Sequence, residues 1–106
     1  MLYLVNSEAK GAYPLPPEQW LELCEKHIEA IMDYKKQGKV VVHGGFVSRK
    51  GGCIIYDVDS NEELGRLDSQ LPLWPFMETA IIPLISTEQA LASLKQALAA
   101  VRLAKK

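Results

Sequence analysis

The side chains best suited to chemistry are His43 and Tyr56, which lie in two short β-prone segments joined by a glycine-rich turn. Histidine titrates near neutrality and can take and return a proton, and a phenol can hold a developing oxygen anion by a hydrogen bond. Tyr3 in the first β-prone segment and Glu78 in the last one add a second phenol and a carboxylate. If the fold brings these side chains together, the sequence predicts a proton-transfer site with His43, Glu78 and Tyr56 as its catalytic residues.

Four residues are expected to bind a small substrate at this site: Tyr3, Gly45, His27 and Trp74. Gly45 is expected to lie beside Tyr56, where the absence of a side chain leaves room for a ring to approach the backbone. His27 lies on a predicted helix and can reach a pocket at the edge of the sheet. Each assignment has a competing interpretation: His43 as a hydrogen-bonded structural residue, the tyrosines as interior packing, and His27 as a solvent-exposed helix residue.

Other kinds of site lack support in the sequence. Gly44 and Gly45 lie inside a β-prone run and do not open a helix, so they are not a phosphate-binding loop. No serine or cysteine lies in a nucleophile signature such as GxSxG. Cys24 and Cys53 lack the spacing of a zinc site and are expected to be reduced. We therefore expect neither a metal nor a cofactor.

The composition is typical of one globular domain over residues 1–106. Apolar residues make up 48% and charged residues 24% of the chain, which is the balance of a folded protein. The formal net charge of −1 leaves no basic excess for a nucleic acid. The apolar start meets charge too early for a signal peptide, and no apolar run approaches the roughly 20 residues that span a bilayer. We expect a cytoplasmic protein without nucleic-acid or membrane partners.

Hydrophobic spacing predicts the order strand, helix, strand, strand, helix, strand and one further helix. This is the order of a ferredoxin-like α+β fold, with residues 86–106 as a C-terminal helical extension. Two helix starts carry capping-box sequences, Ser60 with Glu63 and Ser86 with Gln89. Pro83 indicates that the last strand lies at an edge or contains a bulge. The expected strands cover residues 2–6, 40–47, 53–58 and 76–85, and the expected helices begin near Pro16, Ser60 and Ser86.

The second face of this sheet needs a cover, because right-handed connections place both early helices on one face. Residues 40–42, 54–55 and 81–82 are apolar at consecutive positions, whereas a water-facing strand alternates. The extra helix is one candidate cover. A second copy of the sheet is the more economical one, so we expect a homodimer that encloses a barrel-like interior, or a larger ring-shaped homo-oligomer, with a small-molecule ligand inside.

The expected hairpin register decides which side chains meet in that interior. An even-length turn around residues 49–52 pairs Val47 with Ile54 and His43 with Val58, and an odd turn shifts the register by one. The even register places His43, Gly45 and Tyr56 on the face turned away from the helices, where a pocket between subunits would lie.

Three stretches resemble the muconolactone Delta-isomerase family: Met1–Val5, Asp57–Leu64 and Leu71–Glu78. The last of them, Leu-Pro-Leu-Trp-Pro-Phe-Met-Glu, is the most specific, and the likeness covers roughly residues 1–84. The resemblance implies a dimeric α+β barrel, often assembled into larger rings, with a pocket between subunits for a small carboxylated lactone. The family carries a basic and aromatic run on its second strand, whereas residues 40–46 here supply a single histidine. This difference disfavours muconolactone itself as the substrate.

Two functions from different classes follow. The first is an isomerase-like enzyme that shifts a proton within a small lactone or carbonyl compound. The alternative is a non-catalytic module of the same barrel fold that binds a small ligand or serves in assembly, because one fold hosts many functions. Cofactorless oxygenation of a phenol, known of similar barrels, is a third interpretation that rests on analogy.

Overall fold

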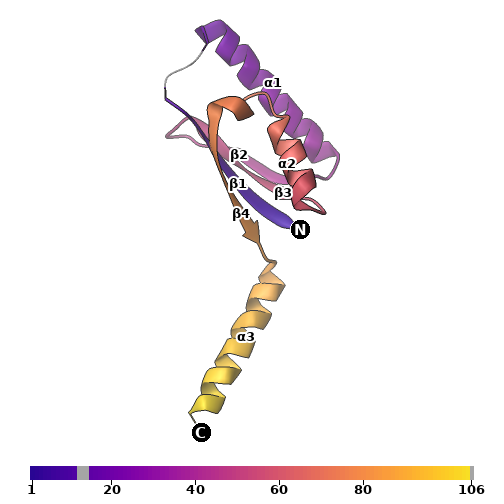
Figure 1. The fold of residues 1–106 in the computed structure, drawn as a ribbon, viewed down its shortest axis with the longest axis vertical. Helices are drawn as coiled ribbons and strands as arrows, with labels where there is room; N and C mark the ends of the chain where they lie inside the picture. Colours follow the sequence, from indigo (N-terminus) through magenta and orange to yellow (C-terminus); the bar gives the residue numbers. More distant parts are fainter. Residues whose placement is uncertain (12–14, 106) are drawn as a thin grey trace.

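The computed structural model describes residues 1–11 and 15–105, which form a four-stranded sheet, two helices packed on it and a third helix that extends away (Figure 1). The predicted order of elements is confirmed. In chain order the elements are β1 (Leu2–Ala9), α1 (Pro17–Lys36), β2 (Val40–Gly45), β3 (Gly51–Asp57), α2 (Asn61–Ser69), the 3-10 helix η1 (Trp74–Phe76), β4 (Met77–Leu84) and α3 (Thr87–Ala104).

The sheet has the strand order β2-β3-β1-β4, and every neighbouring pair is antiparallel. The helices α1 and α2 lie on one face of it (Figure 1). This is the ferredoxin-like α+β arrangement that the sequence predicts. The strand β4 lies at the sheet edge, where Pro83 interrupts no central ladder.

Local sequence explains where the helices begin and end. Pro17 occupies the first turn of α1, and Gly38 follows the helix with a φ of +77°, a conformation that favours glycine. The hydroxyl of Ser60 caps α2 by accepting a hydrogen bond from the Glu63 N–H, at 3.1 Å. The Glu63 carboxylate accepts from the Asp59 N–H and not from that of Ser60, so only half of the predicted capping box forms. The full box at Ser86 and Gln89 of α3 is confirmed.

The predicted hairpin register and the predicted faces of the hairpin are both wrong. His43 pairs with Ile54, and the turn falls between β2 and β3 at residues 46–50, while Gly51 and Gly52 belong to β3. The register shifts between Val40 and Val42, as at a β-bulge. His43, Ile54 and Tyr56 do share one face, but it is the face beneath the helices.

That face carries the core. Tyr56 and Val5 are fully buried, and Tyr3 is 6% exposed. The opposite face, which we call the open face, has no helix over it (Figure 1). It presents Leu4, Val42, Ile55 and Ile82, of which Val42 and Ile82 are about half exposed. Of the consecutive apolar pairs, Ile54 is buried while Ile55 lies on the open face, whereas Ile81 and Ile82 are both about half exposed.

The helix α3 continues beyond the end of β4 and leaves the body of the protein, so the molecule measures 67 × 29 × 22 Å (Figure 1). None of its residues is buried. No helix among the described residues is long and apolar enough to cross a membrane.

The glycines at the start of β3 provide a test of this packing. A Cβ added at Gly51 would lie 2.1 Å from the Ser7 carbonyl oxygen, whereas one added at Gly44 would meet nothing within 4 Å. Gly51→Ala is expected to lower the free energy of unfolding by about 1 to 3 kcal/mol through overpacking. Gly44→Ala is the matched control and should change it little. Urea unfolding measures both, and equal effects of the two substitutions would contradict the described approach of β1 and β3.

Candidate functional site

A cavity of about 60 Å³ lies between α1, the segment after α2 and the helix-covered face of the sheet. Its lining is mostly apolar, with Ile28 and Ile31 from α1 and Met77 from β4. Four polar side chains reach it: Ser7, His27, His43 and Asp68. Gly51 and Gly52 form part of its sheet wall, where any side chain would strike backbone atoms.

His27 enters the cavity from α1 and is held by the segment that links α2 to η1. The Leu73 N–H donates a hydrogen bond to His27 Nδ1 at 3.1 Å. Burial, with a smaller effect from His43, lowers the pKa of His27 to about 4. The ring is therefore neutral near pH 7. Because Nδ1 accepts, the ring proton must reside on Nε2, which leaves an N–H donor on the other side of the ring.

His43 reaches the same cavity from β2. Burial lowers its pKa, and the charge of Lys35 on α1 lowers it further. Both imidazoles are thus neutral near pH 7. His43 can accept a proton, and His27 can donate a hydrogen bond from its Nε2–H. Among the residues that the structure describes around the cavity, no lysine or arginine contributes to the lining.

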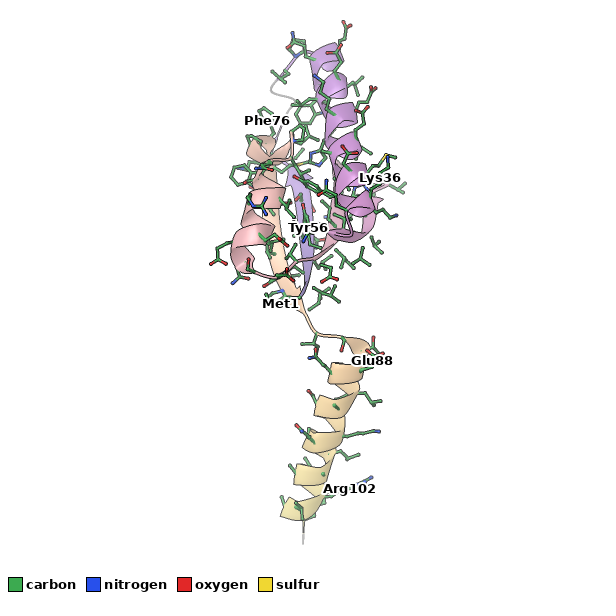
Figure 2. All side chains as sticks on the ribbon, turned by 90° about the vertical axis from the view of Figure 1, so that its right-hand side faces the viewer. Met1, Lys36, Tyr56, Phe76, Glu88 and Arg102 are labelled. Atoms are coloured by element: carbon green, nitrogen blue, oxygen red, sulfur yellow. The ribbon has the colours of Figure 1, made fainter. Side chains whose placement is uncertain are left out.

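Asp68, near the end of α2, supplies the buried carboxyl group. It is 4% exposed and accepts a hydrogen bond from the Tyr56 hydroxyl at 2.9 Å. Burial raises the pKa of Asp68, although the Tyr56 hydrogen bond lowers it in part. Burial and the neighbouring Asp68 in turn raise the pKa of Tyr56, which therefore stays a phenol. Tyr56 lies deep between the helices and the sheet (Figure 2).

The structure brings three of the predicted site residues to the cavity lining: His27, His43 and Trp74. Trp74 is 45% exposed and stands in η1 at the cavity margin. Tyr56 is not a lining residue, but it supports Asp68, which is.

The remaining predicted site residues lie elsewhere. Glu78 is exposed and faces Glu8 across β1 and β4, on the open side of the sheet. Tyr3 is buried in the core, and its hydroxyl donates to the Asn61 side chain. Gly45 is exposed at the end of β2 and does not line the cavity. The prediction that His43 and Tyr56 lie on the face away from the helices is therefore wrong, because both lie on the face that the helices cover.

Sequence reasoning missed Asp68 and Ser7. Asp68 has the residue type of a solvent-exposed position, but it lies four residues after Leu64 and so on the face of α2 that the buried leucines define. The sequence signal that could have found it is this spacing of four from Leu64, which is buried. Ser7 lay beyond the predicted end of the first strand, which the structure extends to Ala9.

A metal centre has no support in the described part of the chain, since no three histidine, cysteine, aspartate or glutamate side chains gather there in a way that could hold an ion. Cys24 and Cys53 are free and partly buried. The chemistry available at the cavity is therefore that of two neutral imidazoles, a buried carboxyl group and a hydroxyl.

Comparison with known proteins gives concordant results. The family model described as muconolactone delta-isomerase matches residues 1–90. A Muconolactone Delta-isomerase from Cupriavidus pinatubonensis is 30% identical over 84 residues, which cover 79% of this chain and 91% of that protein.

Two solved structures share the fold. A crystal structure of muconolactone isomerase superimposes with a TM-score of 0.73 at 23% identity, covering 81% of this chain and 90% of the other. The 5-chloro-2-hydroxyhydroquinone dehydrochlorinase from Burkholderia phenoliruptrix, in complex with 2,5-dihydroxybenzoquinone, gives a TM-score of 0.66 at 15% identity, over 84% of this chain and 98% of the other.

The matched region contains every described element except most of α3, and it includes the Leu71–Glu78 string whose Leu73 N–H holds His27. Because the family model spans far more than half of the sequence, the chain belongs to the muconolactone delta-isomerase family.

Proposed function

We propose that this protein is an isomerase that moves a proton within a small, uncharged lactone or carbonyl compound bound at the cavity beneath α1. The observation that carries the proposal is the meeting of two neutral imidazoles and a buried carboxyl group in one mostly apolar cavity. Membership of the isomerase family supports the reaction class.

The roles follow from the protonation states. Neutral His43 takes a proton from the carbon next to the carbonyl group, and the electron pair moves onto the carbonyl oxygen. The Nε2–H of His27 donates to that oxygen and stabilises the enolate, as a preorganised neutral donor does in a site from which water is excluded. The proton then returns from His43 to a different carbon, which restores neutral His43 for the next turnover.

The size and charge of the cavity restrict the substrate. A volume of about 60 Å³ is well below the roughly 300 Å³ of an ordinary ligand pocket. The enclosed part therefore holds the reacting end, and the remainder of a substrate lies toward Ile28 and Trp74, which are 42% and 45% exposed. Among the described residues that line the cavity there is no lysine or arginine to pair with a substrate carboxylate, so we place uncharged compounds first.

The open face supports the proposal of a homodimer. Leu4, Val42, Ile55 and Ile82 form an apolar surface on it that a second sheet would cover. The two free cysteines fit a reducing compartment, which supports a cytoplasmic location.

Solvent deuterium exchange tests the reaction. The protein is expected to incorporate deuterium into a β,γ-unsaturated five-membered lactone without a carboxyl group while converting it to the conjugated isomer. His43→Ala should slow both processes by about 10² to 10⁴-fold, the usual contribution of a general base. Glu78→Gln should leave the rate unchanged, because Glu78 lies on the other side of the sheet. Mass spectrometry and absorbance measure the two processes.

Two results would contradict the proposal. Full exchange by His43→Ala would remove His43 from the mechanism. No turnover of any lactone or ketone, together with saturable thermal stabilisation by one of them, would establish the non-catalytic binding module instead.

The titration of His27 gives an independent check. Its NMR pKa is expected to be about 4, against an ordinary value of 6.5. Between those values the unfolded chain binds a proton that native His27 does not, so His27 makes stability fall as pH drops through this window. The raised pKa of Asp68 acts in the opposite direction, so a residue-specific titration is the right measurement.

His43→Gln should raise the His27 pKa only in part, since burial is the larger cause of its lowered value. An unshifted His27 pKa in the native protein would contradict the described burial.

A further inference from the structure

The helix α3 carries an apolar stripe that nothing in its own chain covers. Leu91, Leu94, Leu98 and Val101 recur at spacings of three, four and three, and they are between 48% and 67% exposed. This spacing is that of a helix that packs along another helix. Most of α3 lies beyond residue 90, where the family match ends, so the stripe is an addition to the family body.

The chain's own body is poorly placed to cover the stripe. Only Ile85 and Ser86 separate β4 from α3, and the capping box at Ser86 fixes where the helix starts. From there α3 points away from the sheet (Figures 1 and 2). In proteins most of the stability of a helix comes from the packing of its apolar face and not from helix propensity, so a partner for the stripe would stabilise α3.

The residues on the two flanks of the stripe indicate what that partner is. Glu88, Lys95 and Arg102 recur every seven residues along one flank, and Ala90, Ala97 and Ala104 recur along the other. Glu88 stands near the beginning of α3 and Arg102 near its end (Figure 2). A helix with a negative start and a positive end is complementary to a copy of itself that runs in the opposite direction.

We propose that α3 pairs in antiparallel orientation with α3 of a second copy of this chain. In this pairing Leu94 packs on Leu98 of the second copy, and Leu91 packs on Val101. Glu88 then faces Arg102 of the second copy at both ends of the pair. The alanine flanks meet each other and allow the two helices to approach closely. A parallel pair would instead set the charged flank of each helix against alanines and gain no ion pair.

One contact in this pairing is repulsive, and its removal tests the antiparallel orientation. Lys95 would lie near its own copy at the two-fold axis, where like charges repel. Lys95→Gln is therefore expected to tighten the association, and a weakening would contradict the antiparallel arrangement.

Cysteine cross-linking of the full chain tests orientation and register. In a background where Cys24 and Cys53 are replaced by alanine, Ala97→Cys places a thiol on the alanine flank next to its own copy. Mild oxidation is expected to give disulfide-linked dimers at least tenfold faster than in Gln96→Cys, whose thiol lies on the outer surface of α3. Equal rates, or no linked dimer from Ala97→Cys, would overturn the proposal.

Charge exchange tests the end contacts. Glu88→Arg and Arg102→Glu each replace two attractive contacts with two repulsive ones, so each is expected to raise the dissociation constant from sedimentation equilibrium by about tenfold. The double variant restores the pairs and should return the constant to within about threefold of the original. If α3 packs on the open face of another copy instead, the double variant will not rescue. Circular dichroism of each variant confirms that the helices remain folded.

Discussion

The hydrogen bond from the Leu73 N–H to His27 Nδ1 is the interaction on which the site depends. It joins the segment between α2 and β4 to the middle of α1, and it decides which nitrogen of His27 carries the proton. Leu71 and Leu73 are both buried, so the segment is anchored on either side of Pro72. The string that identifies the family is thus also the element that orients a polar side chain at the cavity.

Around this bond, burial sets the chemistry. Desolvation is the largest cause of the lowered pKa of both histidines and of the raised pKa of Asp68. Burial therefore favours the uncharged form of each of the three groups. A neutral imidazole is the form of histidine that can accept a proton from a substrate. Tyr56 belongs to this arrangement as the partner of Asp68 and not as a group that meets the substrate.

Sequence patterns predicted the fold well, because helical spacing, caps and β-branched runs are local signals. The apolar stripe that contains Trp20 and Ile31 predicted α1, and the order of elements then indicated the ferredoxin-like topology.

The site was predicted less well, because its geometry depends on contacts between residues far apart in the sequence. A turn at residues 46–50 moved the hairpin register, and His43 came to lie beneath the helices. The spacing from Leu64 places Asp68 on the buried face of α2, but a carboxylate is rarely expected at a buried position without a partner, and its partner Tyr56 lies on a different element.

The molecule therefore divides into a family body, which holds the cavity, and the C-terminal helix, which holds an apolar stripe. The open face of the sheet and α3 are separate exposed apolar surfaces. Their separation means that assembly and chemistry can be examined independently, since the cavity lies on the other side of the sheet from the open face.

The tautomer of His27 is the most direct test of this account. Long-range ¹H–¹⁵N correlation spectra at pH 7 report which ring nitrogen bears the proton. The hydrogen bond from Leu73 predicts a neutral ring with an unprotonated Nδ1 and a protonated Nε2. A charged ring, or a ring protonated on Nδ1, would show that Leu73 does not orient His27, and the proposed stabilisation of an enolate at Nε2–H would be wrong.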